Sequence, residues 1–484
     1  PSIWTPLYEL WGSVTRAQSA GTDLDSQQTR LVLSLAKFTR NLVADVPLNQ
    51  KNAFPLEPQI RQLIYLLTAW TTDNNESTFA TTRMLTQTLS NLVTGNQELL
   101  DQFWSVHMEI PEEQSVLIRL LGLSDLRTVL SVLVLVMNCV HASSERGHTL
   151  VTTSIGIRVC VSILDRLEGQ EDETKVFELG YAVFSELFQF GYFPELYKRT
   201  SIDDEPVSPT QTVLLKLLDS FLNSVPTPFR DQDDHRNNLA GFLASAFLLQ
   251  AEHAQQAIQQ ATGELSPSQN VATDVRGGGG TPTGAASCAL DGRLPGVWVA
   301  FVLLSTCLSS ILLAEHEDCS GVCTDPGGVT SSHVCHDTIS TSRTRAGSGF
   351  IEELLESLRL LHNFLPRINF GKVRSSPEGR EGVPDHAADA ADFPYLKRDL
   401  VRLLGILCHN CRAIQDRVRL CGGIPVVLNL CAIDDRNPYL REYALFALRN
   451  LLHNNSENQA VVNTFQADKH VGPDVVVRDI LGAK

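Results

Sequence analysis

The sequence has few of the patterns on which most enzymes depend. It lacks a phosphate-binding Walker loop, a Gly-x-Ser-x-Gly nucleophile elbow, a His-Glu-x-x-His zinc motif and a Gly-x-Gly-x-x-Gly turn after a strand. The four glycines at 277–280 are followed by no Lys and flanked by no strand pattern. Carboxylates are many but scattered, so no pair can be chosen for acid–base work. The sequence therefore offers no residues to which a reaction can be assigned.

Positive charge is also scarce. The chain has 39 Lys and Arg against 55 Asp and Glu, which gives a formal net charge of −16. This balance argues against general nucleic-acid binding, because phosphates must be faced by Lys and Arg. An acidic protein can attract basic protein partners instead.

Signs of secretion are absent as well. The first residues, PSIWTPLYELWG, lack the basic region and apolar run of a secretory signal. The 11 Cys are odd in number, and several lie inside apolar runs, for example Cys139, Cys160, Cys307 and Cys408. Reduced, buried thiols in a cytoplasmic protein fit this pattern better than a disulfide framework does.

One apolar run is long enough to suggest a membrane span. Residues 297–314, VWVAFVLLSTCLSSILLA, carry no charge. The second half contains four hydroxyl residues, no Lys or Arg cluster flanks the run, and Glu315, Glu317 and Asp318 follow it. We predict a buried core helix, with a membrane span as the alternative.

The clearest positive signal is repetition. The stretches 32–50 and 441–459 both contain Arg-Asn-Leu and both reach Gln nine residues after the Asn. The apolar positions Leu396, Leu400, Leu403, Leu404 and Leu407 follow the 3.6-residue period of a helix face. Adding 44 to each number gives Leu440, Ala444, Ala447, Leu448 and Leu451. Periods of about 40–47 residues are typical of armadillo and HEAT arrays.

These patterns predict an all-α protein, an armadillo- or HEAT-like α-solenoid with disordered insertions. Segments rich in Gly, Ser, Thr and Pro interrupt the repeats. The expected organisation is helical repeats over 1–262, a flexible linker over 263–295, a repeat segment over 296–370 with a disordered insertion at 316–349, a flexible insertion over 371–392, a C-terminal helical domain over 393–466 and a tail over 467–484.

Asn residues recur near the ends of the repeated helices, at Asn41, Asn91, Asn138 and Asn450. An Asn amide has one acceptor and two donors, so it can hold the backbone of an extended partner peptide in a solenoid groove. The alternative is that these side chains satisfy helix-end carbonyls or the neighbouring turn. Arg40 and Arg449 precede two of them and are either solvated or paired surface residues, or partner contacts.

A thiol-rich segment, CSGVCTDPGGVTSSHVCH, offers soft zinc or copper ligands in Cys319, Cys323, His333, Cys335 and His336. Their spacing matches no standard zinc module, so a flexible insertion with chance Cys and His is the competing interpretation. We assign no cofactor to the chain.

Residues 393–462 resemble the C-terminal domain of the ataxin-10 family. The resemblance rests on Tyr-Leu-Lys-Arg-Asp-Leu from Tyr395, Ile-Gln-Asp-Arg-Val from Ile414, and then Gly-Gly-Ile-Pro, Ile-Asp-Asp, Asn-Pro and Arg-Asn-Leu-Leu. The long linker and insertions suggest a divergent, fungal-type member. Ile406 and Ile414 depart from the family pattern, which has Asn and a more polar residue there.

The resemblance implies a non-enzymatic, cytoplasmic armadillo-like scaffold that binds other proteins along its concave surface and acts in cytokinesis or cell-division control. Two alternatives remain at this point. One is a transport adaptor whose acidic groove binds basic peptides, and the other is a copper- or zinc-handling protein that uses the Cys/His segment. The sequence leaves homo-oligomer formation open.

Overall fold

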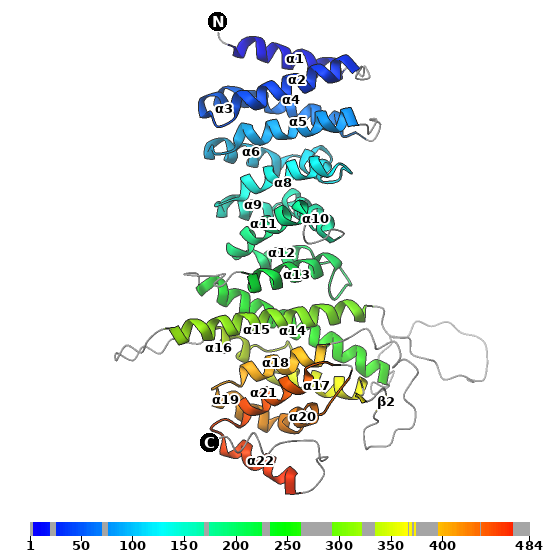
Figure 1. Cartoon of the computed structure of the whole chain (residues 1–484), viewed down its shortest axis with the longest axis vertical. Coiled ribbons are helices and arrows are strands. Elements are labelled where there is room, and N and C mark those ends of the chain that lie inside the picture. Colours follow the sequence, from blue (N-terminus) through cyan, green and yellow to red (C-terminus); the bar gives the residue numbers. More distant parts are fainter. Residues whose placement is uncertain are drawn as a thin grey trace, which may run out of the picture. The chain divides into compact units, whose positions relative to one another are not determined.

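The protein consists of stacked α-helices, as the computed structural model shows (Figure 1). The structure describes residues 3–19, 26–69, 76–168, 174–224, 233–262, 293–321, 334–365, 367–369, 372–373, 395–435 and 437–467. It divides into two compact units, residues 1–201 and 202–484. The described part of the chain thus confirms the all-α solenoid expected from the sequence.

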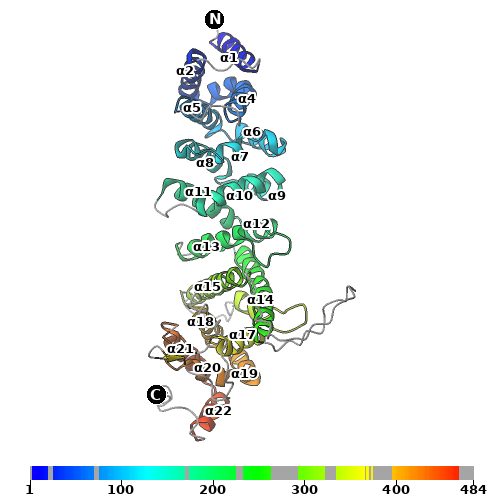
Figure 2. The same cartoon turned by 90° about the vertical axis from the view of Figure 1, so that its right-hand side faces the viewer.

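Unit 1 is built from three rows of helices. Its elements are α1 (Trp4–Ser19), α2 (Ser26–Val43), α3 (Pro47–Ala53), η1 (Phe54–Leu56), α4 (Glu57–Leu67), α5 (Glu76–Val93), α6 (Gln97–Glu109), η2 (Glu112–Gln114), α7 (Val116–Leu121), α8 (Leu126–Val140), α9 (Ser144–Thr152), α10 (Ser154–Glu168), α11 (Lys175–Gln189) and α12 (Phe193–Arg199). Helices α2, α5, α8 and α11 pack one on the next and form the unit 1 ladder (Figure 2). A second row contains α1, α4, α7 and α10, and a third contains α6, α9 and α12.

Unit 2 repeats this plan and contains two longer helices. Its elements are α13 (Pro209–Ser224), α14 (Asp233–Thr262), α15 (Leu294–Gly321), α16 (Val334–Thr341), α17 (Phe350–Phe364), β1 (Ile368–Asn369), β2 (Lys372–Val373), α18 (Leu396–Leu407), α19 (Arg412–Leu420), α20 (Gly423–Leu430), α21 (Leu440–Leu452) and α22 (Ser456–Ala467). The longer helices are α14 and α15, of 30 and 28 residues. Helices α13, α15, α18 and α21 pack in sequence as the unit 2 ladder, and α14, α17 and α20 form the adjacent row. The two short strands pair antiparallel.

The apolar run at 297–314 belongs to α15, which packs against α13, α14 and α18. Its residues 294–317 are long and apolar enough to cross a membrane, but 61% of the apolar window is buried inside the protein. Trp298 and Phe301 are among the buried side chains of this helix. The burial supports the predicted core helix over a membrane span.

Two predicted boundaries differ from the structure. The sequence placed α13 and α14 with the N-terminal repeats up to residue 262, but both helices pack against α15 and belong to unit 2. The insertion expected to be disordered at 316–349 contains the end of α15 and all of α16. Helix α16 forms because both carboxylate oxygens of Glu315 accept hydrogen bonds from its first turn, from Cys335 N at 2.8 Å and His336 N at 3.0 Å. The segments 263–292 and 374–394 lie outside the described residues.

The close approach of α9 to the first turn of α10 leaves no room for a side chain at Gly156. A Cβ atom there would lie 2.1 Å from the carbonyl oxygen of Leu150. Because backbone cannot move aside as a flexible side chain can, we predict that Gly156→Ala lowers the free energy of unfolding of unit 1 by about 3 kcal/mol.

The matched control is Gly12→Ala in α1, where the nearest atom is 3.6 Å away on the Arg16 side chain. This change is expected to leave stability equal or to raise it by up to about 1 kcal/mol, because Ala favours a helix over Gly. Tryptophan fluorescence during urea unfolding measures both, since Trp11 and Trp104 are buried in unit 1. Equal effects of the two variants would contradict the prediction.

Candidate functional site

Three of the four predicted Asn side chains bridge neighbouring ladder helices. Asn91 Nδ2 on α5 donates to the carbonyl of Arg40 on α2 at 3.3 Å. Asn138 Nδ2 on α8 donates to Thr94 Oγ1, just after α5, at 2.9 Å. Asn450 Nδ2 on α21 donates to the carbonyl of Gly405 on α18 at 2.9 Å. The recurring Asn thus ties the end of one ladder helix to the helix before it.

These bonds agree with the helix-end role that the sequence left as an alternative. Asn450 is 7% exposed, so its donor is committed inside the protein. Asn41 is exposed and accepts from the Arg40 side chain at 3.0 Å. Contact of these Asn residues with a partner stays a prediction.

The two arginines before the Asn residues differ in their surroundings. Arg40 Nη1 donates to Gln87 Oε1 at 2.8 Å, and Gln87 Nε2 donates to Ser131 Oγ at 3.3 Å. This connects α2, α5 and α8 through side chains. Arg449 is exposed on α21, and no described residue forms a hydrogen bond or ion pair with its side chain.

A Gln nine residues after the repeated Asn position also has a structural role. It is Gln50 after Asn41, and Gln415 after Ile406, which stands at the Asn position of its repeat. Gln50 Nε2 donates to the carbonyls of Asn91 and Thr94 at 2.9 and 2.8 Å, in the next repeat. Gln415 Nε2 does the same to Asn450 at 2.9 Å, and also reaches the carbonyl of Cys408 at 3.2 Å. These bonds satisfy the last carbonyls of the ladder helices, which have no partner within their own helix.

The residues that depart from the family pattern lie in apolar surroundings. Ile406 is 3% exposed and Ile414 is 4% exposed. Both side chains are packed in the core. An apolar side chain at such a position needs no hydrogen-bond partner, whereas a buried polar one does. The Ile406 side chain cannot donate a hydrogen bond like the one from Asn450 to the Gly405 carbonyl.

A buried ion pair holds the C-terminal repeats, and sequence reasoning missed it. Lys397 on α18 and Asp434, in the loop after α20, have fully buried side chains, with 3.9 Å between Nζ and Oδ2. Lys397 Nζ also donates to the carbonyl of Leu365. Asp434 accepts from Ile368 N at 3.2 Å and from Asn437 Nδ2 at 2.8 Å. The Lys-Arg-Asp and Ile-Asp-Asp motifs, far apart in sequence, therefore meet in one network.

This network also affects a histidine on α17. Burial lowers the pKa of His362 to about 4, and the positive charges of Lys397 and Arg367 act in the same direction. In unit 1, burial likewise lowers the pKa of His107, whose Nε2 lies 3.0 Å from Glu57 Oε1. Both shifts favour the neutral imidazole, and the His107 side chain is fully buried in the core.

The candidate metal ligands are divided by the structure. Cys335 and His336 are buried on α16, and His336 Nε2 donates to the carbonyl of Leu407 at 2.9 Å. The side chains of Cys319, Cys323 and His333 lie outside the described residues. Within the described ranges, no group of three or more His, Cys, Asp or Glu side chains could hold a metal ion.

The described cysteines are free thiols, and most of them are buried. Burial raises the pKa of the Cys160 and Cys431 thiols to about 12. It raises the pKa of Cys408 too, so this thiol is not the readily ionised group that redox chemistry needs. Packing is the role that the structure supports for these residues.

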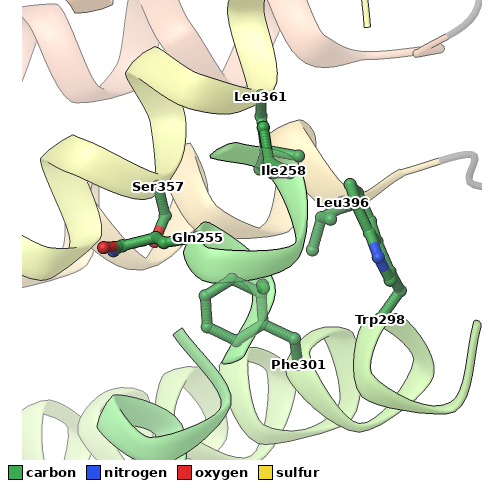
Figure 3. A pocket seen from close by; sticks show the side chains of 8 residues that line it. Gln255, Ile258, Trp298, Phe301, Ser357, Leu361 and Leu396 are labelled. Carbon is green, nitrogen blue, oxygen red and sulfur yellow. The ribbon is translucent and has the colours of Figure 1, made fainter. Parts of the chain in front are cut away.

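A small space between α14, α15, α17 and α18 is lined by Gln255, Trp298, Phe301 and Ser357 (Figure 3). Gln255 Nε2 donates to Ser357 Oγ at 3.1 Å. The volume is about 10 Å³, which is at most enough for one water molecule. It is a packing defect of the core, too small for a substrate.

The C-terminal repeats match a known family. Residues 396–480 fit the model described as the spinocerebellar ataxia type 10 protein domain. We call residues 396–480 the ataxin-10 domain, after the family model that they match. Over 114 residues the chain is 33% identical to ataxin-10 of Bos taurus, which covers 24% of this chain and 23% of that protein. Over 97 residues it is 36% identical to the ataxin-10 homolog of Kluyveromyces lactis, covering 20% and 18%.

The similarity to these relatives covers only a part of each chain. The chain matches about a fifth of the length of each of the two. Among solved structures, the crystal structure of SYS-1 aligns over 95% of this chain and 87% of its own, at 10% identity and a TM-score of 0.30. An alignment that loose carries no argument, so the solenoid assignment rests on the helix rows described above.

We predict that Asn450→Ala lowers the melting temperature of the full chain, because the Gly405 carbonyl loses its partner inside the protein. The expected cost is about 1–3 kcal/mol. Asn41→Ala, which removes an exposed amide, should cost under about 0.5 kcal/mol. Circular dichroism during heating compares the two, and a larger effect from Asn41→Ala would show that the bridging bond contributes little.

We also predict that Asp434→Asn destabilises unit 2 by about 3 kcal/mol, because Lys397 is left with a buried, uncompensated charge. The neighbouring Asp435 is exposed and offers a matched control, Asp435→Asn, with an expected cost under about 0.5 kcal/mol. Pulse proteolysis in urea, with cleavage mapped to residues 395–467, measures both. Similar urea midpoints for the two variants would rule out a structural role for the ion pair.

Proposed function

We propose that this protein is a non-enzymatic scaffold that binds other proteins along its two helix ladders. The observation that carries the proposal is the construction of the ladders. Successive repeats place equivalent helices side by side, so side chains from α2, α5, α8 and α11, or from α13, α15, α18 and α21, form one continuous surface. Such surfaces suit extended partners, because each repeat contributes a contact at a regular interval.

The exposed apolar residues of the ladders support this assignment. Phe38 on α2 is 46% exposed, Val134 on α8 is 39% exposed and Phe446 on α21 is 39% exposed. Covering a large, water-exposed apolar side chain with a partner lowers the free energy of the system and so favours binding. The ladders therefore have the apolar anchors that a protein interface requires.

From the resemblance to the ataxin-10 family we further propose a role in cytokinesis or cell-division control, with the cytoplasm as the place of action. These finer statements extend the family resemblance to the whole chain. The transport-adaptor alternative is less favoured, because the C-terminal repeats are weakly basic, as the next subsection describes. The metal-handling alternative depends on Cys319, Cys323 and His333, and deletion of residues 319–333 with measurement of bound zinc and copper tests it directly.

The scaffold assignment predicts that polar substitutions on the ladders remove partners. Phe38→Ser, Val134→Ser and Phe446→Ser, combined in one chain, should remove a defined set of proteins from the tagged chain purified out of dividing cells. We expect at least about tenfold less of those proteins, since each lost anchor costs about 1–2 kcal/mol. Quantitative mass spectrometry measures the loss, and counts of binucleate cells report on division.

The matched control places the same change on exposed apolar residues outside the ladders. Leu48 on α3 is 69% exposed and Leu420 on α19 is 80% exposed. Leu48→Ser with Leu420→Ser should keep the partners. If the control loses the same proteins as the ladder variant, the ladders are not the binding surface.

A further inference from the structure

The last two helices of the unit 2 ladder begin in the same unusual way. Each starts with Tyr-Leu, and the tyrosine before the first helical residue is in the left-handed conformation, with φ of 79° at Tyr395 and 64° at Tyr439. A side chain in this conformation costs about 1–2 kcal/mol. Tyr395 is 39% exposed and Tyr439 is 67% exposed. Both repeats thus hold a tyrosine in a strained position and leave its ring partly open to water.

Arginines lie beside the aromatic rings of these helices. The guanidinium carbon of Arg398 is 4.2 Å from the centre of the Tyr395 ring, and that of Arg402 is 5.8 Å from the centre of the Tyr443 ring. Phe446 lies on Gly405, where a Cβ would come within 2.7 Å of the phenyl ring. We call this surface the arginine–tyrosine face; it consists of Tyr395, Arg398, Arg402, Tyr439, Tyr443 and Phe446.

Arg402 is the least satisfied cation on this face. Arg398 is paired through Nε and Nη2 with the two oxygens of Asp399, at 2.8 and 3.0 Å. No described residue forms a hydrogen bond or ion pair with the Arg402 side chain, and Asp219 is a carboxylate whose charge interacts with it. A guanidinium has five donors in a fixed fork, which match a carboxylate. Arg402 can therefore donate hydrogen bonds to a carboxylate of a partner.

The charge of the surrounding repeats has the sign that such a partner needs. Helices α18 and α21 contain one Lys and four Arg, against Asp399 and Glu442. Residues 395–467 contain nine Lys and Arg against six Asp and Glu, although the whole chain has a net charge of −16. The described residues of the ataxin-10 domain thus form a weakly basic region in an acidic protein.

We propose that the arginine–tyrosine face binds an acidic, extended peptide segment of a partner protein that also carries apolar side chains. The carboxylates pair with Arg402, and the apolar side chains cover the tyrosine rings and Phe446. This inference rests on the proposed scaffold function and gives the chemistry of one partner. A polyanionic nucleic acid fits less well, because the acidic remainder of the chain repels it and half-exposed apolar rings contribute little to phosphate binding.

The test uses the full chain and a fluorescein-labelled peptide of about twelve residues that combines Asp and Glu with Phe and Leu. A neutral peptide, with Asn and Gln in place of Asp and Glu, is the first control. We expect the acidic peptide to bind at least about tenfold more tightly by fluorescence anisotropy, and its affinity to fall as salt is raised. Equal binding of the two peptides overturns the proposal.

Variants then locate the site. Arg402→Gln should weaken binding of the acidic peptide at least about fivefold. The affinity of Arg402→Lys should lie between those of the unmodified chain and Arg402→Gln, because Lys keeps the charge but lacks the planar fork. Arg412→Gln on α19 removes an arginine already paired with Asp416 at 3.1 Å and should leave binding unchanged. Circular dichroism first establishes equal folding. An equal loss from Arg412→Gln shows that binding responds only to net charge and overturns the site.

Two further outcomes would assign the face to another occupant and so overturn the proposal. The first is a single-stranded oligothymidine that displaces the peptide at equal or lower concentration. The second is a dimer of the chain, measured by sedimentation, that Arg402→Gln dissociates. If the peptide fails but the ladder variant with Phe38→Ser, Val134→Ser and Phe446→Ser still loses its partners, the partner chemistry is wrong and the scaffold function stands. Retention of all partners by that variant would reject the scaffold itself.

Discussion

The structure depends on how the carbonyl groups at the ends of its long helices find hydrogen-bond donors. A helix leaves its last carbonyls without partners in its own backbone, and in a packed array these groups are shielded from water. Here amide side chains from adjacent repeats supply the donors. Asn91 and Asn450 reach back to the preceding ladder helix, while Gln50 and Gln415 reach forward to the following one. Each repeat is therefore complete only when its neighbours are present.

This dependence connects the fold with the proposed function. Hydrogen bonds from Asn and Gln side chains, together with buried apolar side chains, hold the inner faces of the ladder helices. Residues on the outer faces can therefore vary without disrupting the packing of the repeats. In the ataxin-10 domain, the Lys397–Asp434 pair and its hydrogen bonds fix α18 against the loop before α21. The rigid support holds Tyr395 and Arg402 in place, so binding loses little conformational entropy.

The sequence predicted the features that repeat and missed those that occur once. The helix period and the Asn spacing located α2, α5, α8, α18 and α21. The α11 repeat went unnoticed because Leu187 stands where the others have Asn, although Gly191 still follows the helix with a positive φ of 78°. Helix α16 was missed because the composition around it is polar, and its cap, Glu315, lies on another helix. The Lys397–Asp434 pair is a tertiary contact that no local pattern reveals.

Hydrogen exchange in a Gln415→Leu variant tests the central claim most directly. Gln415 is 2% exposed, and its single donor group contacts the ends of both α18 and α21. The account predicts that amides in the last turns of α18 and α21 exchange faster together, by about tenfold or more, while α13 keeps its protection. Faster exchange confined to α19, which carries the substitution, would contradict the claim that side chains crossing between repeats hold the ladder together.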